Sequence, residues 1–144
     1  MKEIWHEISI KSPPGTIYQA LTQADKLAQW WIPDTRGESK PGNILEFRFG
    51  DGCQLMRVSA LEPDRLVCWQ PTEEDDSDWA GTQVQFTVLP VDGRSTVQFR
   101  HSGFRGDAER YPYYSMSWAV FLLSLKQLVE DGEGFPFPNR WIHQ

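Results

Sequence analysis

A single long amphipathic segment near the C-terminal end constrains the fold of this 144-residue chain most. Its apolar side chains recur three, four, seven and eight positions apart, which is the spacing of one face of an α-helix. A glycine follows at a place typical of a helix C-terminus. Such a helix must bury its apolar face, so the rest of the chain has to supply a surface for it. The residues of this face are Tyr114, Trp118, Phe121, Leu122, Leu125, Leu128 and Val129, and the glycine is Gly132.

Alternating apolar and polar residues predict that this surface is a β-sheet. A first strand over 4–10 leads into two short helices, one opened by Ser12-Pro13-Pro14 and one capped by Asp25. A loop over 34–43 comes next, and then five strands joined by short turns such as Asp51-Gly52. Short turns imply antiparallel pairing, and the first strand should close onto the last one. The prediction is an α+β fold with a curved, six-stranded antiparallel sheet wrapped on one long helix.

The length and the net charge of the chain limit its number of domains and its possible classes of partner. The length predicts one domain, which we place at residues 1–132, with a tail over 133–144 packed on the same domain. A net charge of −6 argues against nucleic acid and against an anionic membrane surface, and no apolar run is long enough to span a membrane. Cys53 and Cys68 fall several rungs apart on a predicted hairpin, too far for a disulfide. Two reduced thiols in a chain without a leader indicate the cytoplasm.

Several segments of the chain carry a resemblance to a known family. They are Ile8-Ser9-Ile10, Tyr18-Gln19-Ala20-Leu21-Thr22, Leu27-Ala28-Gln29-Trp30-Trp31, Met56-Arg57-Val58, Leu61-Glu62-Pro63, Val67-Cys68-Trp69, Gly81-Thr82, His101-Ser102-Gly103-Phe104 and Glu130-Asp131-Gly132. With them, the chain is similar to the START-like (SRPBCC) superfamily and its helix-grip fold. Within it, the chain resembles homologues of the C-terminal domain of the heat-shock-protein-90 ATPase activator. The resemblance implies a cavity between sheet and helix, which holds an apolar molecule in many relatives; a few relatives are enzymes, and the eukaryotic activator binds its chaperone through such a domain.

Aromatic residues on the inward faces of these elements suggest a binding pocket. Trp30 and Trp31 are adjacent on a helix and point about 100° apart, so we expect one in the core and one half-exposed at the rim. The leading hypothesis is a small protein that binds a hydrophobic or aromatic small molecule, with empty space above roughly 300 Å³. The candidate ligand-binding residues are Trp30, Trp31, Met56, Trp69, Phe86, Phe99, His101, Tyr114, Trp118 and Phe121.

Two other functions stay open. The chain could be an interaction module, either a homodimer or a chaperone partner, which a packed interior and exposed apolar patches would favour. It could also be an enzyme that uses His101 or a nearby tyrosine as a proton shuttle. His101 shares a strand face with Val97 and Phe99, and we expect it to bond to a backbone group or to Tyr114. No carboxylate has an obvious place beside it, so no catalytic residue is assigned.

Metal and cofactor sites are not predicted. The histidines His6, His101 and His143 lack the spacing of metal ligands, and no phosphate-binding glycine loop is present.

Two loops are candidate lids over a cavity mouth. The run Glu73-Glu74-Asp75-Asp76-Ser77-Asp78 carries five of the twenty acids and should be extended by its own repulsion, as a solubilising loop or a lid. The segment 102–110 contains two glycines that could act as hinges. Trp79 lies beside the acidic run, and we expect Trp5 and Trp141 to meet where the tail crosses the outer sheet face.

Overall fold

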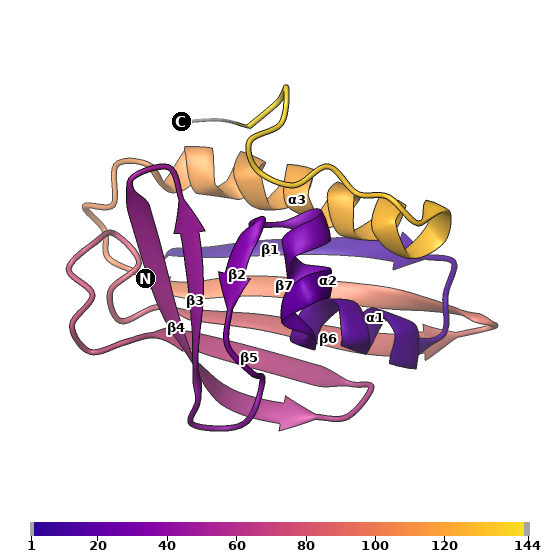
Figure 1. Ribbon diagram of the computed structural model, residues 1–144. Coiled ribbons are helices and arrows are strands. Elements are labelled where there is room, and N and C mark those ends of the chain that lie inside the picture. The colour runs from indigo at the N-terminus through magenta and orange to yellow at the C-terminus, as the bar shows by residue number, and fades with distance from the viewer. Residues whose placement is uncertain (1, 143–144) are drawn as a thin grey trace.

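The computed structural model, which describes residues 2–142, is an antiparallel sheet with three helices on one face (Figure 1). The sheet has seven strands in the order β1-β7-β6-β5-β4-β3-β2. Helix α3 lies beside β1, while α1 and α2 cover β5, β6 and β2. The elements are β1 (Lys2–Ile10), α1 (Pro14–Thr22), α2 (Ala24–Trp30), β2 (Asp34–Arg36), β3 (Ile44–Phe49), β4 (Gly52–Glu62), β5 (Leu66–Pro71), β6 (Gln83–Val91), β7 (Arg94–Phe104) and α3 (Tyr111–Asp131).

The predicted helix-grip architecture is confirmed. The first strand closes onto the last, with Ile4 opposite His101 and Ile8 opposite Val97. Helix α3 ends where the sequence predicts, since Gly132 adopts a left-handed conformation with φ of 88° directly after it. None of the helices in residues 2–142 is long and apolar enough to cross a membrane.

The strand count was wrong by one, because part of the predicted loop forms the edge strand β2. Asp34 lies opposite Arg48 and Arg36 opposite Glu46, so opposite charges face each other across the pair. Three exposed or half-exposed residues show no apolar alternation, which is why the sequence pattern did not reveal this strand.

The two short helices start at different residues than predicted. Pro13 occupies the cap position of α1, and the Ser12 hydroxyl bonds to the Pro13 carbonyl instead of capping the helix. Gln23 caps α2, which leaves Asp25 inside the first turn, where a carboxylate still favours the helix dipole.

Both cysteines are free thiols, as predicted. A bulge between Val58 and Ala60 shifts the β4–β5 register by one, so Cys68 lies opposite Ala60. Cys68 is buried and Cys53 is exposed, at the far end of β4.

Aromatic rings fill the space between the sheet and the helices. Trp69 and Phe86 on the sheet are fully buried, with their ring centroids 5.2 Å apart. Trp118 of α3 packs on Phe99 at 4.5 Å, and Trp31 lies parallel to Trp69 at 5.6 Å. This filling determines how much room is left for any ligand.

Two fully buried tryptophans provide a matched test of one hydrogen bond. Trp30 donates its indole N–H to the Ala20 carbonyl at 2.7 Å, near the end of α1 where helix carbonyls lack helical partners. Trp69 has no such partner among the described residues. We expect Trp30→Phe to lower the free energy of unfolding by about 1–2 kcal/mol more than Trp69→Phe, because it leaves a buried carbonyl unpaired. Denaturant unfolding of both variants measures this, and equal losses would contradict it.

Candidate functional site

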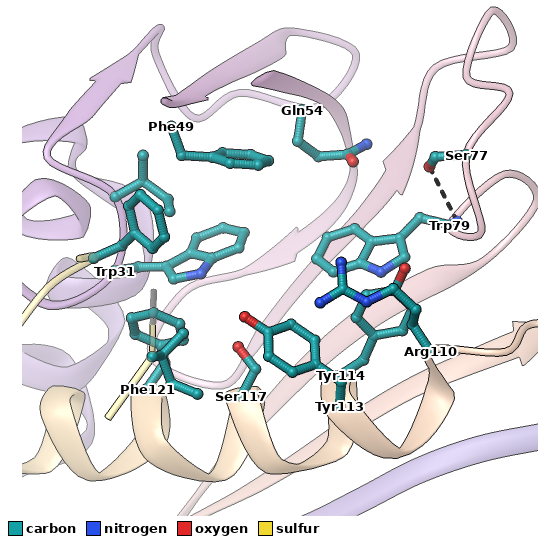
Figure 2. A pocket seen from close by; sticks show the side chains of 13 residues that line it. Trp31, Phe49, Gln54, Ser77, Trp79, Arg110, Tyr113, Tyr114, Ser117 and Phe121 are labelled. Atoms are coloured by element: carbon teal, nitrogen blue, oxygen red, sulfur yellow. Dashed lines mark hydrogen bonds between the residues drawn. The ribbon is translucent and has the colours of Figure 1, made fainter. Parts of the chain in front are cut away.

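An open pocket lies beside α3, and aromatic side chains form most of its wall (Figure 2). Its volume is about 210 Å³, which is below the roughly 300 Å³ expected for a cavity that binds a drug-sized ligand. The wall comes from α3, the end of α2, strands β3 and β4, the acidic loop and the tail. Its residues are Trp31, Ile32, Phe49, Gln54, Ser77, Trp79, Arg110, Tyr113, Tyr114, Ser117, Phe121, Phe137 and Ile142.

Only some of the predicted ligand-binding residues reach this pocket. Trp31, Tyr114 and Phe121 line it. The others are buried and pack against one another behind its wall, so the interior that was expected to be empty is filled. They are Trp30, Met56, Trp69, Phe86, Phe99, His101 and Trp118.

The prediction that either Trp30 or Trp31 is half-exposed was wrong. Trp30 is fully buried and Trp31 is only 5% exposed. The 100° separation of adjacent helical residues does not apply, because α2 ends at Trp30 and Trp31 has left the helix. Trp31 can therefore turn inward as well, where one face lies against the core and its edge reaches the pocket.

Trp79 was missed as a pocket residue. Its ring meets His101 edge-on at 4.7 Å and lies 6.0 Å from Trp118, and it forms the wall opposite Trp31 (Figure 2). The only signal in the sequence is a large aromatic residue at the end of a run of acids, where solubility alone would not require it.

A chain of hydrogen bonds holds Trp79 in place. Trp118 donates its indole N–H to His101 Nδ1 at 3.1 Å, which leaves the proton of a neutral imidazole on Nε2. His101 Nε2 then donates to Thr82 Oγ1 at 2.9 Å, and Thr82 donates to the Trp79 carbonyl at 2.6 Å. The chain connects α3, β7 and the loop, and every buried polar atom in it has a partner.

His101 is not suited to proton transfer near neutral pH. It is fully buried, and burial lowers its pKa to about 3. The expected contact with Tyr114 is replaced, because Tyr114 donates its hydroxyl to Asp78 Oδ2 at 3.0 Å. Burial, together with Asp78, raises the pKa of Tyr114 to about 12, so this hydroxyl also keeps its proton. Both groups act as fixed parts of the wall.

The acidic loop is bonded to the sheet rather than extended by repulsion. Asp75 accepts hydrogen bonds from the backbone and the hydroxyl of Ser77 and from the Gln54 amide. Burial raises the pKa of Asp75, but these bonds lower it by more. Arg57 also pairs with Glu73 at the start of the loop. The loop therefore presents Ser77 and Trp79 to the pocket in a defined position.

Two larger hollows, of about 530 and 320 Å³, flank the same loop. Polar groups line both, such as Gln70 and Glu73 in the larger hollow, Glu74 in the smaller one and Thr72 in each. They bury little apolar surface, so the aromatic pocket is the better candidate for a small ligand.

The tail closes one side of the pocket. Phe137 N–H bonds to the Trp31 carbonyl at 2.7 Å, and Phe135 N–H bonds to the Ser124 hydroxyl at 2.8 Å. The ring of Trp141 packs edge-on against that of Phe135, with the centroids 5.0 Å apart. The Arg100 guanidinium, by contrast, lies over the Trp5 ring, 4.4 Å from its centroid. Trp5 and Trp141 were expected to contact each other, but no ring contact joins them within residues 2–142.

Gly134 is where the tail approaches the helices most closely. A Cβ there would lie 2.6 Å from the Gln29 carbonyl oxygen and 3.0 Å from that of Ser124. We expect Gly134→Ala to cost about 1–3 kcal/mol, because backbone atoms cannot yield as a flexible side chain can. Gly106→Ala, with open space at its Cβ, is the control. Thermal unfolding and hydrogen exchange at the Phe137 amide measure the effect; equal behaviour of the two variants would refute it.

The described residues contain no group of three or more His, Cys, Asp and Glu that could hold a metal ion. His143 lies outside the described residues.

A curved antiparallel sheet gripping one long helix, with a pocket beside that helix, defines a protein of the helix-grip class. The family described as "Activator of Hsp90 ATPase homolog 1-like protein" matches residues 11–130, and the chain belongs to this family. No curated protein matches the chain.

Solved structures agree with this assignment. The Aha1 dimer from Colwellia psychrerythraea is 39% identical, with a TM-score of 0.87 over 93% of this chain and 100% of that one. A protein from Mesorhizobium loti is 26% identical, with a TM-score of 0.77 over 89% of this chain and 96% of its own. A protein from Staphylococcus saprophyticus shares the fold at 15% identity, with a TM-score of 0.78 over 93% and 96% of the two chains.

Proposed function

We propose that this protein binds a small, planar hydrophobic molecule in the aromatic pocket. The observation that carries the proposal is the convergence of aromatic side chains from separate parts of the chain on one opening of about 210 Å³. An apolar cavity of about 150 Å³ holds benzene, so this volume suits one or two fused rings rather than a lipid or a sterol. Both cysteines are free thiols, which fits the reducing cytoplasm as the proposed compartment.

The tryptophans of the wall provide the test. Indole or naphthalene titrated into the protein is expected to change the tryptophan fluorescence in proportion to the ligand bound, and to raise the melting temperature as the free ligand concentration exceeds its Kd. Trp79→Ala should abolish both changes, because it removes the wall opposite Trp31. Trp5→Ala is the matched control, since Trp5 is 59% exposed and lies outside the pocket. Absence of any response up to millimolar probe, or an equal loss in both variants, would refute the proposal.

A second function, self-association, is favoured by an apolar stripe on the outer face of α3. Met116 is 63% exposed and Leu123 is 53% exposed, and they lie seven positions apart, on the same side as the half-buried Val120. Adjacent exposed apolar side chains often mark an interface. The relative from Colwellia psychrerythraea is described as a dimer, and it covers nearly the whole of this chain. We propose that a second copy of this chain binds this stripe, so that the protein forms a homodimer.

Sedimentation of the whole chain over a range of concentrations tests the dimer. Leu123→Lys is expected to shift the protein to the monomer, because it places a charge in the stripe. Val91→Lys is the control, since Val91 is 46% exposed but belongs to the β6–β7 hairpin. A wild-type monomer at high concentration, or a dimer that survives Leu123→Lys, would exclude this surface.

A further inference from the structure

The polar groups left free around the pocket are mainly hydrogen-bond donors. The Arg110 guanidinium forms no ion pair within residues 2–142, and it lies over the Tyr113 ring at 4.2 Å (Figure 2). The hydroxyls of Tyr113 and Ser117 and the indole N–H groups of Trp31 and Trp79 make no hydrogen bond to described residues. A guanidinium and an indole N–H can only donate.

The acceptors of the wall are largely occupied. The carboxylate of Asp75 accepts from Gln54 and Ser77, and one oxygen of Asp78 accepts from Tyr114. The acceptors left are the Gln54 carbonyl, whose amide nitrogen already donates to Asp75, and the hydroxyl oxygens of Tyr113 and Ser117, which can donate as well. A ligand that fills this pocket must therefore bring acceptors of its own if the free donors are to be satisfied.

The charge of the pocket wall indicates whether the acceptor group of the ligand is neutral or anionic. Arg110 is the cation of the pocket wall, and no carboxylate lies within ion-pair distance of it in residues 2–142. Guanidinium groups bind carboxylates through two parallel hydrogen bonds, which makes them stronger partners for an anion than for a neutral oxygen. The acidic loop opposes an anion at longer range, but its Asp75 and Asp78 are already bonded to the wall.

We propose that the ligand is a planar aromatic carboxylate, with its ring among the aromatic side chains and its acid group at Arg110. This inference depends on the proposed binding function and specifies the ligand class. The ring provides the apolar contact that Trp31, Trp79 and Phe121 offer, and the carboxylate provides the acceptors that the wall lacks.

Three probes of one shape separate the possibilities: 2-naphthoate, 2-naphthamide and 2-naphthylmethylammonium. Affinities are measured by tryptophan fluorescence at one salt concentration. We expect the carboxylate to bind about tenfold more tightly than the amide, since a charge-assisted bond exceeds a neutral one by that order. The ammonium should bind most weakly, because it meets Arg110.

Variants of Arg110 test whether this residue causes the preference for the carboxylate over the amide. Arg110→Gln should reduce the affinity for the carboxylate to that for the amide and leave the amide unchanged, while Arg110→Lys should keep part of the preference. Arg105→Gln is the control, because Arg105 lies in the same loop, pairs with Asp107 and does not line the pocket.

Each outcome has a defined meaning. Equal binding of carboxylate and amide, or tightest binding of the ammonium, overturns the aromatic-acid proposal and leaves the pocket standing. A carboxylate preference that survives Arg110→Gln overturns it as well. If none of the three probes binds but naphthalene does, this proposal fails and the proposed binding function stands; if naphthalene does not bind either, both fail.

Discussion

Lowering the pH from 7 to 4 is expected to cost this fold roughly 3 kcal/mol through one buried histidine. The ordinary pKa of a histidine is 6.5, and burial lowers that of His101 to about 3. Protonation would also place an N–H on His101 Nδ1, which accepts the indole N–H of Trp118. The folded state therefore excludes a proton that the unfolded chain binds.

The sign and the pH window follow from these two pKa values. Above pH 6.5 neither state binds the proton, so the full stability is present. As the pH falls below 6.5 the unfolded state takes up the proton first, and the free energy of unfolding decreases by about 1.4 kcal/mol per pH unit until the pH approaches 3. Asp75 and Glu130 have lowered pKa values, so they add their own loss in the acidic part of this range. The interval between pH 5 and 6.5 is therefore the cleanest measure of His101.

Urea unfolding at half-unit pH steps measures this dependence. His101→Gln should flatten the slope between pH 5 and 6.5, since an amide can accept and donate without titrating. His6→Gln is the control variant, since His6 is only partly buried and bonds to the Ser115 carbonyl. A wild-type slope that persists in His101→Gln would show that another group carries the effect.

Trp31→Ala is expected to destabilise the protein by about 3–5 kcal/mol, as deletion of a large buried aromatic side chain does. Trp31 packs on Phe47 at 4.4 Å, on Trp118 at 5.0 Å and on Trp69 at 5.6 Å, so its loss opens a cavity among rings from three elements. The same change removes one wall of the pocket, so stability and binding should fall together.

Trp79→Ala separates these two effects. Trp79 is half-buried and attached to a loop, so its removal should cost clearly less stability than that of Trp31 while still abolishing probe binding. Denaturant unfolding gives the stabilities and probe titration gives the binding. If Trp31→Ala cost no more than Trp79→Ala, Trp31 would not be the core residue that its contacts indicate.

Elements with a strong period were predictable from the sequence. The apolar face of α3 repeats over several turns, and the alternation in β1, β3, β6 and β7 specifies which side chains face the helix. The edge strand β2 was missed because its pairing depends on charges opposite Arg48 and Glu46, which become neighbours only in the sheet.

The candidate site was less accessible to sequence reasoning. The inward direction of Trp69, Phe86 and Phe99 was correct, yet direction does not reveal whether neighbouring rings leave a gap between them. The positions of Trp31 and Trp79 in the pocket wall both depend on where a regular element ends. Patterns based on periodicity locate such ends poorly.

The sequence by itself determined the class of fold, because one amphipathic helix following an alternating meander has few other ways to bury its apolar face. Only the tertiary structure decided where empty space remains. Most of the rings expected to line a cavity pack into the core, and the opening forms beside α3, between Trp79 on one side and the end of α2 with the tail on the other. The physical reason is that the apolar faces buried in the core can be read from the local periodicity of each helix and strand. A pocket depends on long-range hydrogen bonds such as Phe137 to Trp31 and Tyr114 to Asp78, and on ring shapes that no local pattern contains.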